Sequence, residues 1–257
     1  YAGTSYLVNA STISGMPYAS TSDPWKCLFA RVDLVKKFFP NGDIPKATDE
    51  DLLSNPSKDQ VIAKDNEKGI STADVVAQAK DDRALFYMGI GGCSDKVRTL
   101  TPGDAITGPL NGASFVKWTN LHADGTAQHH QNFSDTDFPM FRLAEIYLTR
   151  AEAKFRLNGS QDGLADILEV QGRANRDLKA SSVDEQTLID EWCREFYMEG
   201  RRRSDLVRFG LFTGSKYLWS FKGGSENGQG IPAKCDIYPI PGDEIKNNPN
   251  MTQNPKY

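Results

Sequence analysis

Apolar side chains between residues 139 and 210 recur with the spacing of amphipathic helices. One stripe of the first predicted helix consists of Met140, Ala144, Tyr147, Ala151 and Phe155. A second stripe consists of Leu143, Ile146, Ala153 and Leu157. Two apolar stripes predict a helix that packs on two sides, as helices do in stacks of helix pairs.

Local end signals divide this region into three helices. Asn158-Gly159 is typical of a helix C-terminus, and Ser160 predicts the N-cap of a second helix. These two helices have the size and small-residue usage of a tetratricopeptide-like hairpin. A capping box, Ser182-Val183-Asp184-Glu185, predicts the start of a third helix that ends at Gly200.

The sequence before residue 137 is rich in loops. Residues 1–24 carry many small and polar side chains and indicate an irregular loop that bears aromatic residues. A short helix is predicted between Leu28 and Phe39 from its apolar spacing. Short apolar runs predict two strands, at 84–88 and at 114–118.

Four prolines and several amides alternate with apolar residues between Ile237 and Pro255. Proline lacks an N–H and fixes φ, so the pattern predicts neither helix nor central strand. The segment is also too apolar for a solvated tail. We expect an ordered strap that is pinned to the helical body by Tyr238, Ile240, Ile245 and Met251.

Composition places the chain among ordinary globular proteins. Of its 257 residues 25% are charged and 39% hydrophobic, and the net charge of −4 argues against a dedicated nucleic-acid binder. No stretch is long and apolar enough to cross a bilayer, and no signal peptide opens the sequence. The four cysteines match no zinc or redox motif, so we expect buried thiols.

Three clusters of polar residues are candidate sites of chemistry. Arg201-Arg202-Arg203 could bind an anion, but ion pairs with Glu195, Glu199 and Asp205 explain it better. The histidines at 122, 129 and 130 have no acidic or cysteine partner at a metal-binding spacing, so no metal site is predicted.

Asp135 and Asp137 could be paired catalytic carboxylates, but capping of the following helix is the better interpretation. The sequence contains no nucleophile elbow, phosphate loop or dinucleotide fingerprint. We therefore predict no catalytic residue and no cofactor.

Aromatic rings in polar loops are the remaining candidates for function. Flat rings stack on the C–H faces of sugars, while neighbouring polar groups bind hydroxyls. Each ring taken singly could equally pack beneath its own loop. On loop position and ring type we select Trp25, Tyr18, Trp118 and Tyr6 as ligand-binding residues.

Several motifs together resemble the C-terminal half of the SusD/RagB family. They are the run from Phe141 to Ala153, the run from Arg194 to Arg202, Asp205 to Gly210, the strap from Tyr238 to Tyr257, and Asp82-Arg83 before an apolar strand. They occur in the family's order and cover about the last 180 residues. The family's usual Arg-x-Arg-Ala pattern is replaced here by Gln171-Gly172-Arg173-Ala174, and its terminal Gly-Tyr by Lys256-Tyr257.

The resemblance implies a mainly α, SusD-like fold with tetratricopeptide-like helix pairs and long irregular loops. On this basis residues 1–136 form a loop-rich region that faces the ligand, and residues 137–257 form a helical scaffold and strap. The family's N-terminal repeats and its lipidation cysteine are not in this sequence, so we expect the C-terminal portion of a longer protein.

The resemblance also implies a function. Members are non-catalytic lipoproteins of Bacteroidetes, anchored at the cell surface in the outer membrane by an N-terminal lipid. They pass oligosaccharides to a TonB-dependent, SusC-like transporter. Two alternatives stay open: a member that binds peptides, and a helical scaffold that only contacts other proteins.

Overall fold

The structure is a computed structural model that describes residues 2–12, 21, 23–25, 27–44, 72–87, 112–122, 124–126, 129–130 and 132–257. The chain divides into two compact units, Tyr1–Gly200 and Arg201–Tyr257. Helices are the main regular secondary structure of the described residues, which confirms the predicted mainly α class. The predicted ligand-facing role of residues 1–136 stays a prediction.

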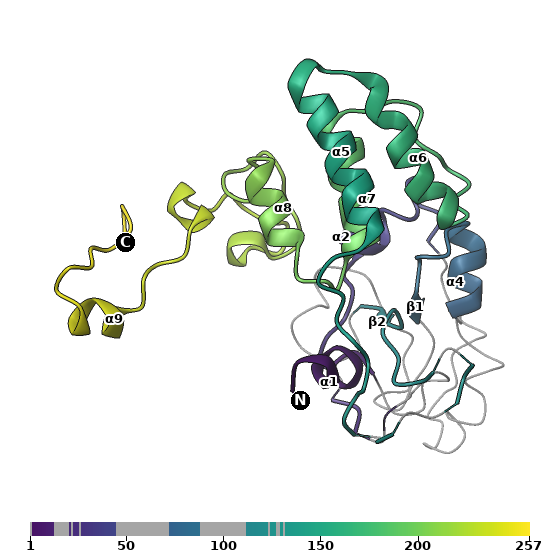
Figure 1. Cartoon of the computed structure of the whole chain (residues 1–257), viewed down its shortest axis with the longest axis horizontal. Helices are drawn as coiled ribbons and strands as arrows, with labels where there is room; N and C mark the ends of the chain where they lie inside the picture. Colours follow the sequence, from purple (N-terminus) through teal and green to yellow (C-terminus); the bar gives the residue numbers. More distant parts are fainter. Residues whose placement is uncertain are drawn as a thin grey trace. The chain divides into compact units, whose positions relative to one another are not determined.

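A helical hairpin forms one part of the first unit (Figure 1). Its first helix is α5, Leu143–Asn158, and its second is α6, Leu164–Arg173, preceded by the 3-10 turn η3, Gln161–Gly163. Gly159 ends α5 in the left-handed conformation at φ 67°, and the Ser160 hydroxyl accepts a hydrogen bond from the Asp162 amide. Both predicted end signals are therefore confirmed.

Only one of the two predicted stripes of α5 is buried within this unit. Ala144 and Ala151 of the first stripe are buried, although Met140 at its start is 77% exposed. Leu148, which neither predicted stripe included, is also buried, whereas Leu143 and Ile146 of the second stripe are 66% and 59% exposed. The expectation that α5 packs on two sides is thus met on one side among the residues that the structure describes.

The third helix, α7 (Glu185–Phe196), packs against α5. Its N-cap is Asp184, whose carboxylate accepts a hydrogen bond from the Thr187 amide at 2.6 Å. The predicted capping box is wrong by two residues, because an aspartate is as good a cap as the serine before it. The helix also ends earlier than predicted, at Phe196.

A small sheet and an aromatic core lie beneath the helices. The strands β1 (Phe86–Tyr87) and β2 (Ser114–Phe115) pair antiparallel, with Phe86 opposite Phe115, inside both predicted strand segments. Phe38, Phe86, Phe115 and Tyr197 bring their rings together at centroid distances of 5.4–6.1 Å. Tyr197 follows α7 directly, so this core joins the helical part of the unit to the sheet.

Two short helices flank the core. The helix α2 (Val32–Val35) is shorter than the segment predicted between Leu28 and Phe39. The helix α4 (Thr72–Ala79) packs against β1 through Val75 and Ala79.

The N-terminal residues correct a prediction. Ala2–Asn9 form the helix α1 where an irregular loop was expected. The Ser11 hydroxyl donates to the carbonyl of Leu7 at 2.8 Å, and the Thr12 hydroxyl donates to that of Val8 at 2.6 Å. The small polar residues that indicated a loop therefore satisfy the last carbonyls of a helix.

The second unit contains α8 (Arg202–Arg208), the 3-10 turns η4 (Lys222–Gly224) and η5 (Ala233–Asp236), and α9 (Gly242–Asn247). The six-residue helix α9 contradicts the prediction that the strap contains no helix. It starts directly after Pro241, where a missing amide hydrogen costs nothing because a helix N-terminus leaves that donor unpaired anyway.

Amide side chains, rather than buried apolar ones, order the strap. Tyr238 is 68% exposed, while Ile240, Ile245 and Met251 are half-buried, so none of the four is a fully buried anchor, and their pinning of the strap to the helical body stays a prediction. Instead, Gln253 accepts from the Ile240 amide at 2.8 Å and donates to its carbonyl at 2.9 Å. The strap closes on itself through this pair of hydrogen bonds.

The cysteines differ in exposure. Cys193 is buried as predicted, but Cys27 is exposed and Cys235 is half-buried, which corrects the expectation of buried thiols. Cys93 lies outside the described residues. No helix within the described ranges has the length and apolar character required to cross a membrane.

Candidate functional site

Tyr6 and Trp25 form an exposed pair of aromatic rings in the first unit. Tyr6 lies on α1 and Trp25 on the segment that follows it, with ring centroids 6.1 Å apart and ring planes inclined at 58°. The two residues are 46% and 42% exposed. The sequence selected both rings, and the structure brings them together.

Hydrogen bonds fix Trp25 in place. Its amide donates to the carbonyl of Asn9 at the end of α1 at 2.8 Å, and its indole N–H donates to the Asp23 carboxylate at 2.9 Å. The Asn9 side chain donates to the carbonyl of Asn132 at 3.1 Å. A ring held in this way loses little conformational entropy when a ligand stacks on it.

The other two selected residues lie elsewhere. Tyr18 falls outside the described residues, so its selection stays a prediction. Trp118 is half-buried, stacks on Phe138 at 6.1 Å and 23°, and donates its indole N–H to the carbonyl of Met198 at 3.3 Å. It lines a pocket of about 350 Å³, which we call the α7 pocket because α7 and the residues after it supply much of its wall.

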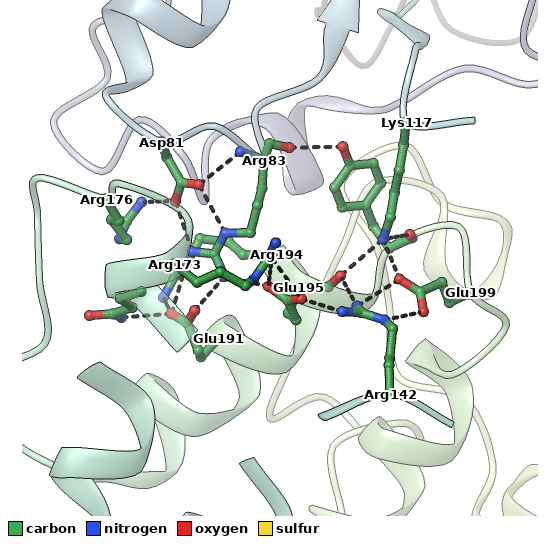
Figure 2. A network of polar contacts seen from close by, with 12 residues as sticks. Asp81, Arg83, Lys117, Arg142, Arg173, Arg176, Glu191, Arg194, Glu195 and Glu199 are labelled. Atoms are coloured by element: carbon green, nitrogen blue, oxygen red, sulfur yellow. Dashed lines mark hydrogen bonds and ion pairs between the residues drawn. The ribbon is translucent and has the colours of Figure 1, made fainter. Parts of the chain in front are cut away.

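Charged side chains form most of the wall of the α7 pocket. The lining residues are Asp82, Arg83, Leu85, Lys117, Trp118, Pro139, Arg142, Arg173, Ala174, Arg194, Glu195, Tyr197 and Glu199. Many of them belong to a network of ion pairs that Figure 2 shows from close by. The network consists of Asp81, Arg83, Lys117, Arg142, Arg173, Arg176, Glu191, Arg194, Glu195 and Glu199.

Glu191 lies at the buried end of the network. Its carboxylate accepts from Arg83 Nη1 at 2.6 Å, from Arg194 Nη2 at 2.7 Å and from the Gln171 amide at 2.7 Å. Burial alone would raise the pKa of Glu191, but the charges of Arg194 and Arg83 and the hydrogen bond from Gln171 outweigh it and lower the pKa to about 2. The carboxylate is therefore ionised at neutral pH.

Arg142 holds the end of the network nearest α5. It precedes α5 and donates to Glu195 and, through Nε at 2.8 Å, to Glu199. Lys117 also donates to Glu199 and to the carbonyls of Glu195 and Tyr197, both at 2.9 Å. Burial lowers the pKa of Lys117, although Glu199 opposes the shift. These groups already use their hydrogen bonds on one another, which favours a structural role for most of the network.

Two members of the pocket wall remain more open. The side chain of Arg173 is 61% exposed and donates only through Nη2, to Glu195 at 3.1 Å, in the contacts of the described residues. Asp82 is exposed and accepts from the Asn175 amide at 2.6 Å. These are the pocket groups that a ligand or partner can reach most easily.

The other candidate clusters take local roles. Arg203 donates to the carbonyl of Cys235 at 2.8 Å and its guanidinium lies 4.0 Å from the Tyr238 ring centroid, while Asp205 pairs with Arg208 at 2.9 Å. Of the predicted ion pairs, the one between Arg201 and Asp205 is present at 3.6 Å. Glu195 and Glu199 instead pair with basic residues of the network described above.

The acids before α5 do not cap it. Asp135 accepts from the His129 amide at 3.1 Å, and the N-cap residue of α5 is Arg142, which makes no side-chain cap. The predicted capping by Asp135 and Asp137 is therefore wrong. His130 accepts from the Asn132 amide through Nδ1 at 3.1 Å, a hydrogen bond within the loop.

Sequence reasoning missed the buried charge network. Asp82-Arg83 was noted only as part of a motif, yet Arg83 binds Glu191 and Glu195, which lie 108 and 112 positions away. The available signal was the number of charged residues on the predicted buried face of α7. A charge at such a position requires a partner, because an unpaired buried charge is very costly.

Comparisons with known proteins assign the fold. A sequence model of the SusD family matches residues 7–257. The starch-binding protein SusD of Bacteroides thetaiotaomicron is 49% identical over 261 residues, which cover 100% of this chain and 46% of that protein. The chain thus spans about half the length of this relative.

Solved structures agree with this assignment. A SusD-like protein of Bacteroides fragilis has a TM-score of 0.61 at 18% identity and covers 98% of this chain and 52% of its own. Surface glycan-binding protein A of Bacteroides thetaiotaomicron, in complex with laminarihexaose, has a TM-score of 0.50 at 17% identity over 96% of this chain and 46% of its own. These likenesses show a SusD-like fold.

Proposed function

The chain belongs to the SusD family, and from that premise we propose that it is part of a cell-surface protein that binds oligosaccharides without chemically changing them. The relative with 49% identity is named for binding starch, which supports a glucan as the ligand class. The starch-binding protein and surface glycan-binding protein A are both named as binding proteins, which supports a non-catalytic role.

The exposed pair of Tyr6 and Trp25 is the observation that carries this proposal. A sugar ring that stacks on either aromatic face removes apolar surface from water, and two rings inclined at 58° offer faces to successive sugars of a chain. Asp23 lies beside Trp25 and provides a carboxylate oxygen for hydroxyl groups. Trp118 and Tyr18 are proposed as further ligand contacts, Trp118 from the α7 pocket.

The setting of the protein is part of the same proposal. Family membership supports attachment to the outer membrane by an N-terminal lipid and transfer of the glycan to a TonB-dependent, SusC-like transporter. Binding at the surface followed by transfer requires only moderate affinity, because a tightly held ligand would leave too slowly.

Isothermal titration of the chain with maltoheptaose and with laminarihexaose tests the proposal. We expect Trp25→Ala to weaken binding about tenfold or more, which corresponds to roughly 1.4 kcal/mol. Phe141→Ala is the matched control, because Phe141 is an aromatic residue with 80% exposure that does not belong to the pair of Tyr6 and Trp25. Equal affinity of the wild type and Trp25→Ala would show that this pair does not bind the glycan.

Titration with a panel of peptides, beside the two glucans, separates the alternatives. Binding of peptides with indifference to both glucans would favour a peptide-binding member of the family. If neither peptides nor glucans bind, the result would favour a helical scaffold that only contacts proteins.

A further inference from the structure

The Arg173 guanidinium in the wall of the α7 pocket is only partly satisfied. Its side chain is 61% exposed, and in the part of the chain that the structure describes only Nη2 donates, to the carboxylate oxygens of Glu195 at 3.1 and 3.3 Å. Nε and Nη1 are left for other acceptors. Arg83 and Arg142, by contrast, each bind at least two carboxylates of the network. An acceptor that enters the pocket can therefore bind Arg173 without breaking an existing ion pair.

The charges around the pocket do not balance. The network of Figure 2 contains six basic and four acidic residues, and Asp82 in the pocket wall brings the acidic total to five. Positive charges thus exceed negative ones by one. Arg176 in the same network also has a donor to spare, because its Nη1 binds Asp81 at 2.9 Å but its buried Nε has no hydrogen-bond partner within the described ranges. One bound negative charge would balance this group of residues.

The size of this imbalance favours a carboxylate as the bound anion. The planar fork of a guanidinium binds a carboxylate through two parallel hydrogen bonds. A carboxylate carries a single negative charge, whereas a phosphate monoester carries about −1.5 to −2 at pH 7. Asp82 and Glu195, which also line the pocket, would repel the additional charge of a phosphate.

An apolar part of the wall favours a ligand that also has a ring. The half-buried Trp118 indole lines the pocket, and Phe138, which is 40% exposed, stacks against it at 6.1 Å. Leu85 and Pro139 add further apolar surface. The volume of about 350 Å³ lies near the lower end of the range for small-molecule sites, about 300–1,000 Å³, and suits a ligand with one sugar ring.

We propose that the α7 pocket binds the carboxylated ring of an acidic sugar, such as a uronic acid residue of a glycan. The sugar carboxylate binds the Arg173 guanidinium, and the sugar ring packs on Trp118. The choice of a sugar rests on the proposed glycan-binding function, whereas the anion site rests on the pocket alone. Tyr6 and Trp25 do not line this pocket, so it is a second site beside that aromatic pair. It extends recognition from neutral glucans to glycans that carry an acidic residue.

Isothermal titration of the 257-residue chain with glucuronate and with glucose tests the proposal. The two sugars share a ring and differ in the carboxylate, so we expect glucuronate to bind at least tenfold more tightly. Arg173→Gln should weaken the binding of glucuronate at least tenfold, because it removes the charge that the carboxylate binds. The binding should also be weaker at 0.5 M than at 0.1 M salt.

Arg150→Gln is the matched control. The Arg150 side chain is 57% exposed and pairs with the buried carboxylate of Asp166, as Arg173 pairs with that of Glu195, but Arg150 does not line the pocket. This variant should bind glucuronate as tightly as the wild type. Far-UV circular dichroism verifies that both variants are folded, which we expect because Glu195 keeps its ion pairs with Arg83 and Arg142 when Arg173 is replaced.

The indole N–H signal of Trp118 gives a second measurement, which uses only the wild type. It is one of four such signals in two-dimensional NMR spectra of the chain, because the sequence contains four tryptophans. Glucuronate should shift the signal of Trp118, and glucose at the same concentration should leave it in place.

Each outcome decides the proposal. It is overturned if glucuronate does not bind the wild type, if it binds no more tightly than glucose, if Arg173→Gln binds it equally well, or if the Trp118 signal stays in place. Acetate or inorganic phosphate that binds as tightly as glucuronate also overturns it, because the sugar ring would then contribute nothing. Trp25→Ala should bind glucuronate as tightly as the wild type, so a failure of the aromatic pair to bind maltoheptaose is distinct from a failure of the α7 pocket.

Discussion

Replacing Glu191 by glutamine should remove much of the stability that the buried charge network provides. Glu191 is 0% exposed and its carboxylate is bound by two guanidinium groups and one amide. The neutral side chain keeps the shape but loses the charge that balances Arg83 and Arg194. One amide hydrogen would also point at a guanidinium donor.

The structure allows the cost to be calculated in two ways. The folded protein lowers the pKa of Glu191 from 4.5 to about 2, and each pKa unit corresponds to about 1.4 kcal/mol, so the ionised form is favoured by about 3 kcal/mol. Removing one partner of a buried ion pair generally costs about 3–5 kcal/mol. We therefore expect the free energy of unfolding to fall by about 3 kcal/mol.

Urea unfolding at pH 7, followed by far-UV circular dichroism, measures this loss. Glu169→Gln is the matched control, because it removes one negative charge from an exposed position of α6. Its free energy of unfolding should change by no more than about 0.5 kcal/mol.

The dependence on pH gives an independent test. The folded pKa of Glu191 lies below the unfolded one, so its contribution is present above about pH 4.5 and is lost as pH falls toward 2. The difference between the wild type and Glu191→Gln should shrink to about 1 kcal/mol near pH 3. Equal stability at pH 7, or a difference that is constant down to pH 3, would refute the reasoning.

Two further predictions concern local packing and the strap. In the same urea titration, Gly163→Ala should lower the free energy of unfolding by about 1–3 kcal/mol, because the added Cβ would lie 2.8 Å from a backbone oxygen of α5. Gly172→Ala is the control: its Cβ would enter open space, so the variant should be neutral or more stable by up to about 1 kcal/mol. Gln253→Ala removes both side-chain hydrogen bonds to Ile240, so hydrogen exchange at the Ile240 amide should become faster than in the wild type. The control Asn247→Ala should leave this rate unchanged, and equal rates in the wild type and both variants would contradict this account of the strap.

Local chemistry explains why the sequence predicted the helical hairpin well. The end of α5 at Gly159 and the start of η3 at Ser160 depend on hydrogen bonds between residues two to four positions apart. The same local reasoning was less successful where several residue types could take one role. Asp184 rather than Ser182 caps α7, and a proline-rich strap accommodates α9 because Pro241 lies just before its first turn.

The amino-acid sequence alone was sufficient for the helix periods of the hairpin, for its turn at Gly159 and Ser160 and for the family motifs, because each of these is a property of neighbouring residues. The contact of Arg83 with Glu191 and that of Tyr6 with Trp25 became known only from the folded structure. It also decided that just one stripe of α5 is buried within its unit. The physical reason is that long-range contacts depend on which faces of distant elements pack together, and periodicity identifies an apolar face without identifying what covers it.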